Sequence, residues 1–203
     1  MITHSFIGAV SLWFVIGYLS GSIPYGLLIA KAFGLGNLRT IGSGNIGATN
    51  VLRTGSKPAA AATLLLDALK GTIPVLAAYT YAGESAAIAA AFGAFLGHIF
   101  PLWLKFKGGK GVATYVGILL GFGWPFLAVF AVIWLGVAAI SRYSSLAALV
   151  ASVAVPAYAF YAANSTIALA FAAMTLIVYL THRANISRLL KGEESRIGNK
   201  GKP

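Results

Sequence analysis

Three polar stretches of this sequence hold the residue types that could do chemistry, and the first is GSGNIGATNVLR at residues 42–53. Its glycines tolerate positive φ, so backbone N–H groups can converge on an anion. The planar fork of an arginine also suits a phosphate group. The stretch therefore predicts an anion site, and a plain loop rich in turn residues is the alternative. The candidate donors are Ser43, Asn45, Thr49, Asn50 and Arg53.

The second stretch, FKGGKGVAT at residues 106–114, leads directly into an apolar segment. Backbone amides, a lysine and the start of a helix together form a common arrangement for holding phosphate. The spacing of the glycines and the lysine is not that of a Walker A motif. We interpret Gly108, Gly109, Lys110 and Gly111 as a phosphate loop. The alternative is a basic loop that only anchors the chain at a membrane surface.

The third stretch, NISRLLKGEESRIG at residues 185–198, leaves two interpretations open. Its bases can simply hold the anionic headgroups of lipids. Alternatively, Asn185, Arg188 and Arg196 belong to a binding site.

Ionisable residues also lie inside the apolar segments. His98 could accept or donate a proton or orient a hydroxyl, because an intramembrane ionisable residue is a functional hypothesis by default, and a packed histidine is the alternative. Asp67 and Lys70 are spaced i, i+3 and predict a structural ion pair on one helix. His4 and His182 are interpreted as ordinary interfacial residues.

The residue types that are missing narrow the reaction class. Asp67 is the only aspartate and cysteine is absent, so the sequence predicts no metal site and no thiol nucleophile. Neither an H-x₄-D arrangement nor a G-x-S-x-G elbow is present. A substrate that arrives already activated, such as an acyl phosphate, needs little more than positioning and charge stabilisation.

The elements that must position these residues are membrane helices. Of 203 residues, 59% are hydrophobic and 9% are charged, and the long apolar runs predict an all-α, polytopic integral membrane protein. The net charge of +11 comes without a zinc-finger or RNA-binding pattern, so no nucleic-acid partner is expected. We expect about seven transmembrane helices, near residues 7–30, 57–81, 85–104 and 112–122, then one ending near 140, followed by 146–161 and 167–180.

The positive charges predict how the chain crosses the membrane. With seven spans, the loops at 31–56, 105–111 and 141–144 and the tail from 182 share one side, and they hold every base outside a span. The positive-inside rule makes this side, with the C-terminus, cytoplasmic and places the N-terminus outside. The fourth span is short, because roughly 11 residues rise only about 16 Å against a hydrocarbon core of about 30 Å. Either it begins inside the preceding loop, or it is a half-helix that begins below the membrane surface.

The polar stretches, with the second extended to GHIFPLWLKFKGGKGVAT, resemble the three signature segments of the bacterial acyl-phosphate:glycerol-3-phosphate acyltransferase family (PlsY), in order and over nearly the whole chain. The resemblance implies one catalytic domain over residues 1–203, in the bacterial cytoplasmic (inner) membrane, with the active site facing the cytoplasm. Such an enzyme moves a fatty acyl group from acyl phosphate to the 1-hydroxyl of glycerol 3-phosphate. It releases lysophosphatidic acid and phosphate, in the first acylation of bacterial phospholipid synthesis, without metal or cofactor. Membrane lipid and the upstream enzyme that forms acyl phosphate are candidate partners.

The family's motifs suggest Ser43, His98 and Asn185 as catalytic residues. We expect the glycerol hydroxyl to attack the acyl carbonyl directly and to lose its proton to a substrate phosphate oxygen rather than to His98, because no acid is placed to orient His98. A membrane transporter for a phosphate-bearing solute is the alternative; the one-sided polar stretches and the lack of a visible repeat count against it. The suggested substrate-binding residues are Asn45, Thr49, Asn50, Arg53, Lys107, Gly108, Gly109, Lys110, Gly111, Ser145, Arg188 and Arg196.

Overall fold

The computed structural model describes residues 2–162 and 164–198, and helices are the regular secondary structure of these residues. The described residues divide into two compact units, which cover residues 2–122 and residues 123–162 with 164–198. The polar stretches at 42–53 and 106–114 belong to the first unit, and the stretch at 185–198 belongs to the second.

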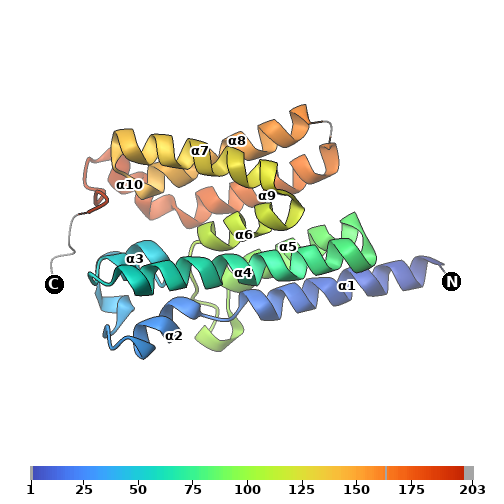
Figure 1. Ribbon diagram of the computed structural model, residues 1–203, viewed down its shortest axis with the longest axis horizontal. Coiled ribbons are helices and arrows are strands. Elements are labelled where there is room, and N and C mark those ends of the chain that lie inside the picture. Colours follow the sequence, from blue (N-terminus) through green and yellow to red (C-terminus); the bar gives the residue numbers. More distant parts are fainter. Residues whose placement is uncertain (1, 163, 199–203) are drawn as a thin grey trace. The chain divides into compact units, whose positions relative to one another are not determined.

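In the first unit, long helices pack side by side and carry shorter helical segments between them. Figure 1 shows α4 and α5 running alongside α1, and α6 packs mainly against α4. The elements in chain order are α1 Ile2–Gly21, α2 Tyr25–Ala32, the 3-10 turn η1 Leu38–Thr40, α3 Ala48–Leu52, α4 Lys57–Ala82, α5 Glu84–Ile99, the 3-10 turn η2 Leu102–Leu104 and α6 Val112–Phe122.

Local signals in the sequence explain where several of these helices begin and end. The first span is interrupted, since α1 ends at Gly21 and α2 begins after Pro24. α4 begins at Lys57, where a span was expected to start, and the Ser56 side chain accepts a hydrogen bond from the amide of Ala59 at 3.3 Å. Pro58 lies in the first turn of α4, where the missing N–H costs no intrahelical bond.

Small residues allow α1 and α5 to pack closely. A Cβ atom at Gly17 or Gly21 would collide with the backbone carbonyls of Ala90 and Ala94 across the contact. In return, Gly93 of α5 lies against the carbonyl of Phe14. Small residues at such crossings let backbones approach each other, which is how membrane helices gain packing contacts where the hydrophobic effect gives them little.

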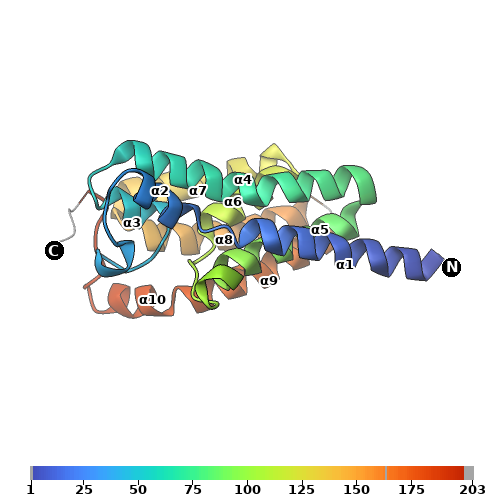
Figure 2. The same cartoon turned by 90° about the horizontal axis from the view of Figure 1, so that it is seen from below.

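The second unit packs α8 between α7 and α9. Its elements are α7 Trp124–Ser141, α8 Ser144–Tyr161, α9 Ser165–Thr181 and α10 Arg183–Leu190. The ring of Phe126 in α7 makes edge contacts with Tyr158 of α8 and Phe171 of α9, which joins the three helices. The basic tail expected from residue 182 starts with a helix, α10, which follows α9 after a bend of 62° (Figure 2).

Five segments of the described residues are long and apolar enough to cross a membrane, and α9 with α10 would form a sixth if the bent pair counts as one span. α6 has only 11 residues, so the expected count of seven depends on this short helix and stays a prediction. The five segments are Phe6–Ala32, Lys57–Ala82, Glu84–Leu104, Trp124–Ser141 and Ser144–Tyr161.

Candidate active site

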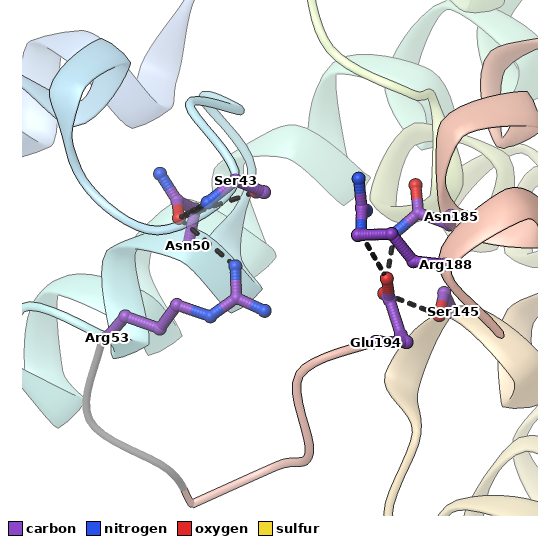
Figure 3. A network of polar contacts seen from close by, with 7 residues as sticks. All are labelled: Ser43, Asn50, Arg53, Ser145, Asn185, Arg188 and Glu194. Atoms are coloured by element: carbon purple, nitrogen blue, oxygen red, sulfur yellow. Dashed lines mark hydrogen bonds and ion pairs between the residues drawn. The ribbon is translucent and has the colours of Figure 1, made fainter. Parts of the chain in front are cut away.

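Asn50 organises the first polar stretch. Its side chain is buried, and its Oδ1 accepts hydrogen bonds from the amide of Ser43 at 3.1 Å and from Nη1 of Arg53 at 3.3 Å. Its Nδ2 donates to the carbonyls of Leu38 at 3.0 Å and Asn45 at 2.7 Å. Figure 3 shows Asn50 with Ser43 and Arg53 around its oxygen. Both polar ends of Asn50 thus bind protein groups, and its direct contact with substrate stays a prediction.

A small apolar core lies under this polar loop. Leu38 and Val51 are fully buried there and pack with Ala30 of α2 and with Ala59 and Ala60 of α4. Two kinds of contact therefore hold the loop: the apolar packing of Leu38 and Val51, and the hydrogen bonds of Asn50.

The other predicted donors of this loop are more exposed to solvent than Asn50. Ser43 and Thr49 are exposed, and Asn45 and Arg53 are half-buried. These four can therefore meet a ligand at the surface of the first unit, while Asn50 holds the loop that carries them.

The second polar stretch returns from η2 to α6 over the end of α5. The amide of Gly108 donates to the carbonyl of Ile99 at 2.9 Å, and the amide of Gly109 donates to the carbonyl of His98 at 3.0 Å. These two amides are consequently not the free anion donors that the glycine-rich pattern suggests. A Cβ atom at Gly109 would lie 2.1 Å from Nε2 of His98, so glycine allows the chain to pass this close to the ring.

Two other features expected of a phosphate loop are present at the start of α6, namely a helix N-terminus and nearby lysines. α6 begins at Val112, directly after Gly111 with φ of 87°, so it does not extend into the preceding loop. The first N–H groups of a helix lack intrahelical partners, and its N-terminus carries a partial positive charge. Lys107 is exposed and Lys110 is half-buried beside this helix start.

Arg39 lies three residues before the first polar stretch and contacts the second. Its Nη2 donates a hydrogen bond to the backbone carbonyl of Lys107. Arg39 itself sits in η1, where Asn37 accepts from its amide at 2.9 Å. The sequence analysis did not single out Arg39, because it lies just outside GSGNIGATNVLR. The only available signal was its position in an acid-free loop.

Glu194 organises the polar stretch of the second unit. Its Oε1 accepts from Ser145 at 2.8 Å and from Nδ2 of Asn185 at 2.6 Å, and its Oε2 pairs with Nε of Arg188 at 2.6 Å (Figure 3). The structure thus brings Ser145, a predicted binding residue at the start of α8, together with two residues of the third stretch. Burial raises the pKa of the Glu194 carboxyl, but the three donors and the adjacent positive charge outweigh this and hold the pKa below its ordinary value.

The sequence analysis missed Glu194, although one signal was present. Only four acidic residues occur in the whole chain, and Glu193 and Glu194 form the only adjacent pair. In so acid-poor a sequence, a carboxylate within a basic stretch indicates a specific partner.

The last predicted residue of the third stretch, Arg196, contacts Tyr143. It is exposed, its Nε donates to the hydroxyl of Tyr143 at 3.4 Å, and its guanidinium lies 5.6 Å from the centre of that ring. The next residue also contacts the turn between α7 and α8, because the amide of Ile197 donates to the carbonyl of Arg142 at 2.7 Å.

His182 is more enclosed than an ordinary interfacial residue. It is buried at the junction of α9 and α10, and its Nδ1 lies 2.8 Å from the carbonyl of Val178. Nδ1 must carry the proton to donate to this carbonyl.

His98 lies in α5 and is 3% exposed. We expected no acid placed to orient this histidine, but Oδ1 of Asp67 lies 3.7 Å from its Nδ1, beyond hydrogen-bond distance. The residues are 31 positions apart in sequence, and only the packing of α4 against α5 brings them together. The predicted pair of Asp67 and Lys70 is confirmed, with 2.6 Å between Oδ1 and Nζ. Within residues 2–162 and 164–198, no three His, Cys, Asp or Glu side chains gather as ligands for a metal ion.

Comparison with known proteins identifies the family. A family model described as glycerol-3-phosphate acyltransferase matches residues 11–192. The glycerol-3-phosphate acyltransferase of Brucella suis is 60% identical over 187 residues, covering 92% of each chain. The enzyme of that name from Mesorhizobium japonicum is 62% identical over 187 residues, which cover 92% of this chain and 95% of the relative.

Crystal structures agree with this assignment. The glycerol 3-phosphate form of PlsY, described as an integral membrane glycerol 3-phosphate acyltransferase, matches with a TM-score of 0.89 and 36% identity, over 93% of this chain and 96% of that one. The lysphosphatidic acid form matches with a TM-score of 0.86 and 34% identity, over 93% and 95% of the two chains. This chain is a multi-pass integral membrane protein, and it belongs to the glycerol-3-phosphate acyltransferase family.

Proposed function

We propose that this enzyme transfers a fatty acyl group from acyl phosphate to the 1-hydroxyl of glycerol 3-phosphate, giving lysophosphatidic acid and phosphate. Family membership makes the chain a glycerol-3-phosphate acyltransferase. The PlsY structures hold glycerol 3-phosphate and lysphosphatidic acid, which supports the acceptor and the product proposed here. The choice of acyl phosphate as donor rests on the resemblance of the three motifs, together with the scarcity of acid–base groups in the chain.

The observation that carries the proposal is a contact inside the first unit between the loop at 31–56, which holds the first signature stretch, and the second signature stretch. Asn50 presents Ser43 and Arg53, and Arg39 binds the backbone of Lys107. Hydroxyl, guanidinium and ammonium groups from separate parts of the chain are thereby held on one unit, as recognition of a phosphate ester requires.

The proposed reaction is a direct acyl transfer. The glycerol oxygen forms a bond to the acyl carbon, the bond from that carbon to the bridging phosphate oxygen breaks, and phosphate leaves with the bonding electrons. A phosphate oxygen of the substrate takes the hydroxyl proton. His98 is less suited to this step because it is buried against Gly109, and this reason replaces the supposed lack of an acid nearby.

We assign the site residues from the family's motifs and from their exposure. Arg53, Lys107 and Lys110 hold substrate phosphate. Ser43 and Asn185 contact the reacting groups. The other proposed binding residues are Asn45, Thr49, Gly111, Ser145, Arg188 and Arg196, while Asn50, Gly108 and Gly109 shape the loops that carry the donors.

We further propose that residues 1–203 act as one catalytic domain in the bacterial inner membrane, with seven spans, the N-terminus outside and the active site facing the cytoplasm. The one-sided distribution of bases supports this topology. The chain has no cysteine, so single cysteines can report the sidedness. Tyr161→Cys should react with an impermeant maleimide from outside the cell and Leu190→Cys only after permeabilisation; the reverse pattern would exclude the topology.

The reaction is tested with purified protein, acyl phosphate and labelled glycerol 3-phosphate, in the presence of a chelator. We expect lysophosphatidate and stoichiometric phosphate, and no product when acyl-CoA replaces acyl phosphate. Product from acyl-CoA alone would overturn the proposed donor. Uptake of glycerol 3-phosphate into proteoliposomes without a donor would favour the transporter instead. The acyl phosphate must be made by another enzyme, and this acyl-phosphate-forming enzyme is the proposed upstream partner.

A further inference from the structure

A buried charged cluster in the first unit has no part in the proposed chemistry. Asp67, Lys70 and His98 are each at most 3% exposed and lie on the long helices α4 and α5. Charged groups inside a membrane protein are costly unless they are paired, and such residues usually carry a function.

Lys70 joins this cluster to the break between α1 and α2. Besides its ion pair with Asp67, its Nζ donates to the carbonyl of Ile23 at 2.8 Å, in the break between α1 and α2. The hydroxyl of Ser20 donates in turn to the carbonyl of Lys70 at 2.9 Å. Lys70 therefore satisfies a carbonyl that the helix break exposes, and it keeps the Asp67 carboxylate in place.

Asp67 faces His98, which contacts the glycine-rich loop. Oδ1 of Asp67 lies 3.7 Å from Nδ1 of His98, and this nitrogen has no hydrogen-bond partner among the described residues. A carboxylate on this side favours the tautomer with the proton on Nδ1. The opposite edge of the ring, with Nε2, occupies the space that a side chain at Gly109 would need, and the His98 carbonyl accepts the Gly109 amide.

We propose that Asp67 is a positioning residue for the glycine-rich loop at residues 108–111, and that it acts by holding the His98 ring against Gly109. The chain of contacts runs from the ion pair inside α4, through the ring on α5, to the backbone of the loop. This inference rests on the proposed function, because that loop and its lysines are taken to hold substrate phosphate. Asp67 touches no substrate, so its loss should weaken binding of glycerol 3-phosphate more than turnover.

The test replaces the charged pair by neutral residues of similar size and measures KM and kcat for glycerol 3-phosphate with the purified full chain. Asp67→Leu/Lys70→Gln removes the carboxylate and leaves no unpaired buried charge, so the fold should survive. We expect KM to rise about tenfold, which corresponds to a loss of about 1.4 kcal/mol in binding, with kcat within about twofold of the wild type.

Two further variants separate positioning from general stability. Asp67→Asn/Lys70→Gln keeps an oxygen that faces His98, and it should restore KM to within about threefold of the wild type. Thr72→Val is the matched control, because Thr72 is a buried polar residue of the same helix whose hydroxyl donates to the carbonyl of Gly117 in α6 at 2.8 Å. It should leave KM unchanged.

Each outcome bears on the inference. An unchanged KM in the Leu/Gln variant overturns it, and so does an equal loss in the Asn/Gln variant. Failure of the Leu/Gln variant to fold also overturns it, because the cluster would then support the whole unit rather than the loop. If the wild type itself forms no lysophosphatidate from acyl phosphate, the proposed function fails first; if the wild type is active and KM does not move, only the role of Asp67 fails.

Discussion

The two polar clusters of this enzyme are built around different kinds of centre. In the first unit, the neutral amide of Asn50 both accepts and donates, and it binds backbone groups as well as Ser43 and Arg53. In the second unit, the carboxylate of Glu194 only accepts, and it gathers one donor from α8 and two donors from α10. An amide can bridge donors and acceptors within one loop, whereas a carboxylate can collect several donors, including a cation, from separate helices.

This difference predicts that the second cluster is the more sensitive to a small change. In Glu194→Gln, the negative charge facing Arg188 is lost and one acceptor oxygen becomes a donor. We expect a loss of about 2–3 kcal/mol in the free energy of unfolding and at least a tenfold loss of kcat/KM. Thermal unfolding and the acyltransfer assay measure both. Glu193→Gln is the matched control, since Glu193 is exposed, and an equal effect in the control would remove the special role of Glu194.

The two centres should also differ in their response to pH. The folded-state pKa of Glu194 lies below its ordinary value, so this carboxylate contributes stability above the unfolded pKa of about 4.3 and loses it as the pH falls through the folded-state value. The difference in Tm between wild type and Glu194→Gln should therefore be constant from pH 6 to 8 and shrink below about pH 4. For Asn50→Ala the corresponding difference should not change in this window. If the Tm difference between wild type and Glu194→Gln grew as the pH fell, the lowered pKa of Glu194 would be contradicted.

Removing the neutral centre, Asn50, should lower stability and activity less than the change at Glu194. Asn50→Ala leaves the carbonyls of Leu38 and Asn45 and the amide of Ser43 without their partner, which we expect to cost about 1–3 kcal/mol of stability. KM for glycerol 3-phosphate should rise because Ser43 and Arg53 lose their orientation. Asn164→Ala removes the helix cap of α9 and is a control for loss of stability alone. A rise in KM in that control would show that KM merely follows stability.

Arg53→Lys tests whether the first cluster needs the planar fork or only a charge. Lysine keeps the positive charge but cannot donate to Asn50 and to a phosphate in the same fork geometry. We expect KM for glycerol 3-phosphate to rise roughly tenfold while Tm changes little. Lys57→Arg, at the exposed start of α4, is the reverse exchange and should have no effect on KM. A wild-type KM in Arg53→Lys would limit the role of this residue to long-range attraction.

The smallest effect should come from the edge of the second cluster. Arg196 is exposed, and its side chain contacts the ring and the hydroxyl of Tyr143. In Arg196→Gln we expect an unchanged Tm and a few-fold higher KM for one of the two substrates. Tyr143→Phe keeps the ring and removes the hydroxyl, so it distinguishes the hydrogen bond from the ring contact. A fall in Tm for Arg196→Gln would show that this residue supports the fold.

Features set by neighbouring residues were predictable from the sequence. The cap at Ser56, the interruption between Gly21 and Pro24 and the pair of Asp67 with Lys70 all depend on residues within four positions of one another. The helix at 112–122 was also expected, with two possible starts, and the structure excludes an extension into the preceding loop.

The contacts that join distant segments were not predictable in the same way. Arg39 with Lys107, Asp67 with His98, and Glu194 with Ser145 are joined only by the packing of helices, which leaves no local pattern. The motifs therefore named most of the candidate donors, while the residues that orient these donors needed the structure.

The pairing of Gly108 and Gly109 with the end of α5 has a consequence for ligand design. A segment whose amides are already committed holds its shape before any ligand arrives, so little ordering entropy is lost on binding. An inhibitor aimed at this region should present its negative charge to the lysine ammonium groups and the first turn of α6. A compound shaped for a ring of unoccupied backbone amides would have to break two existing hydrogen bonds before it could bind.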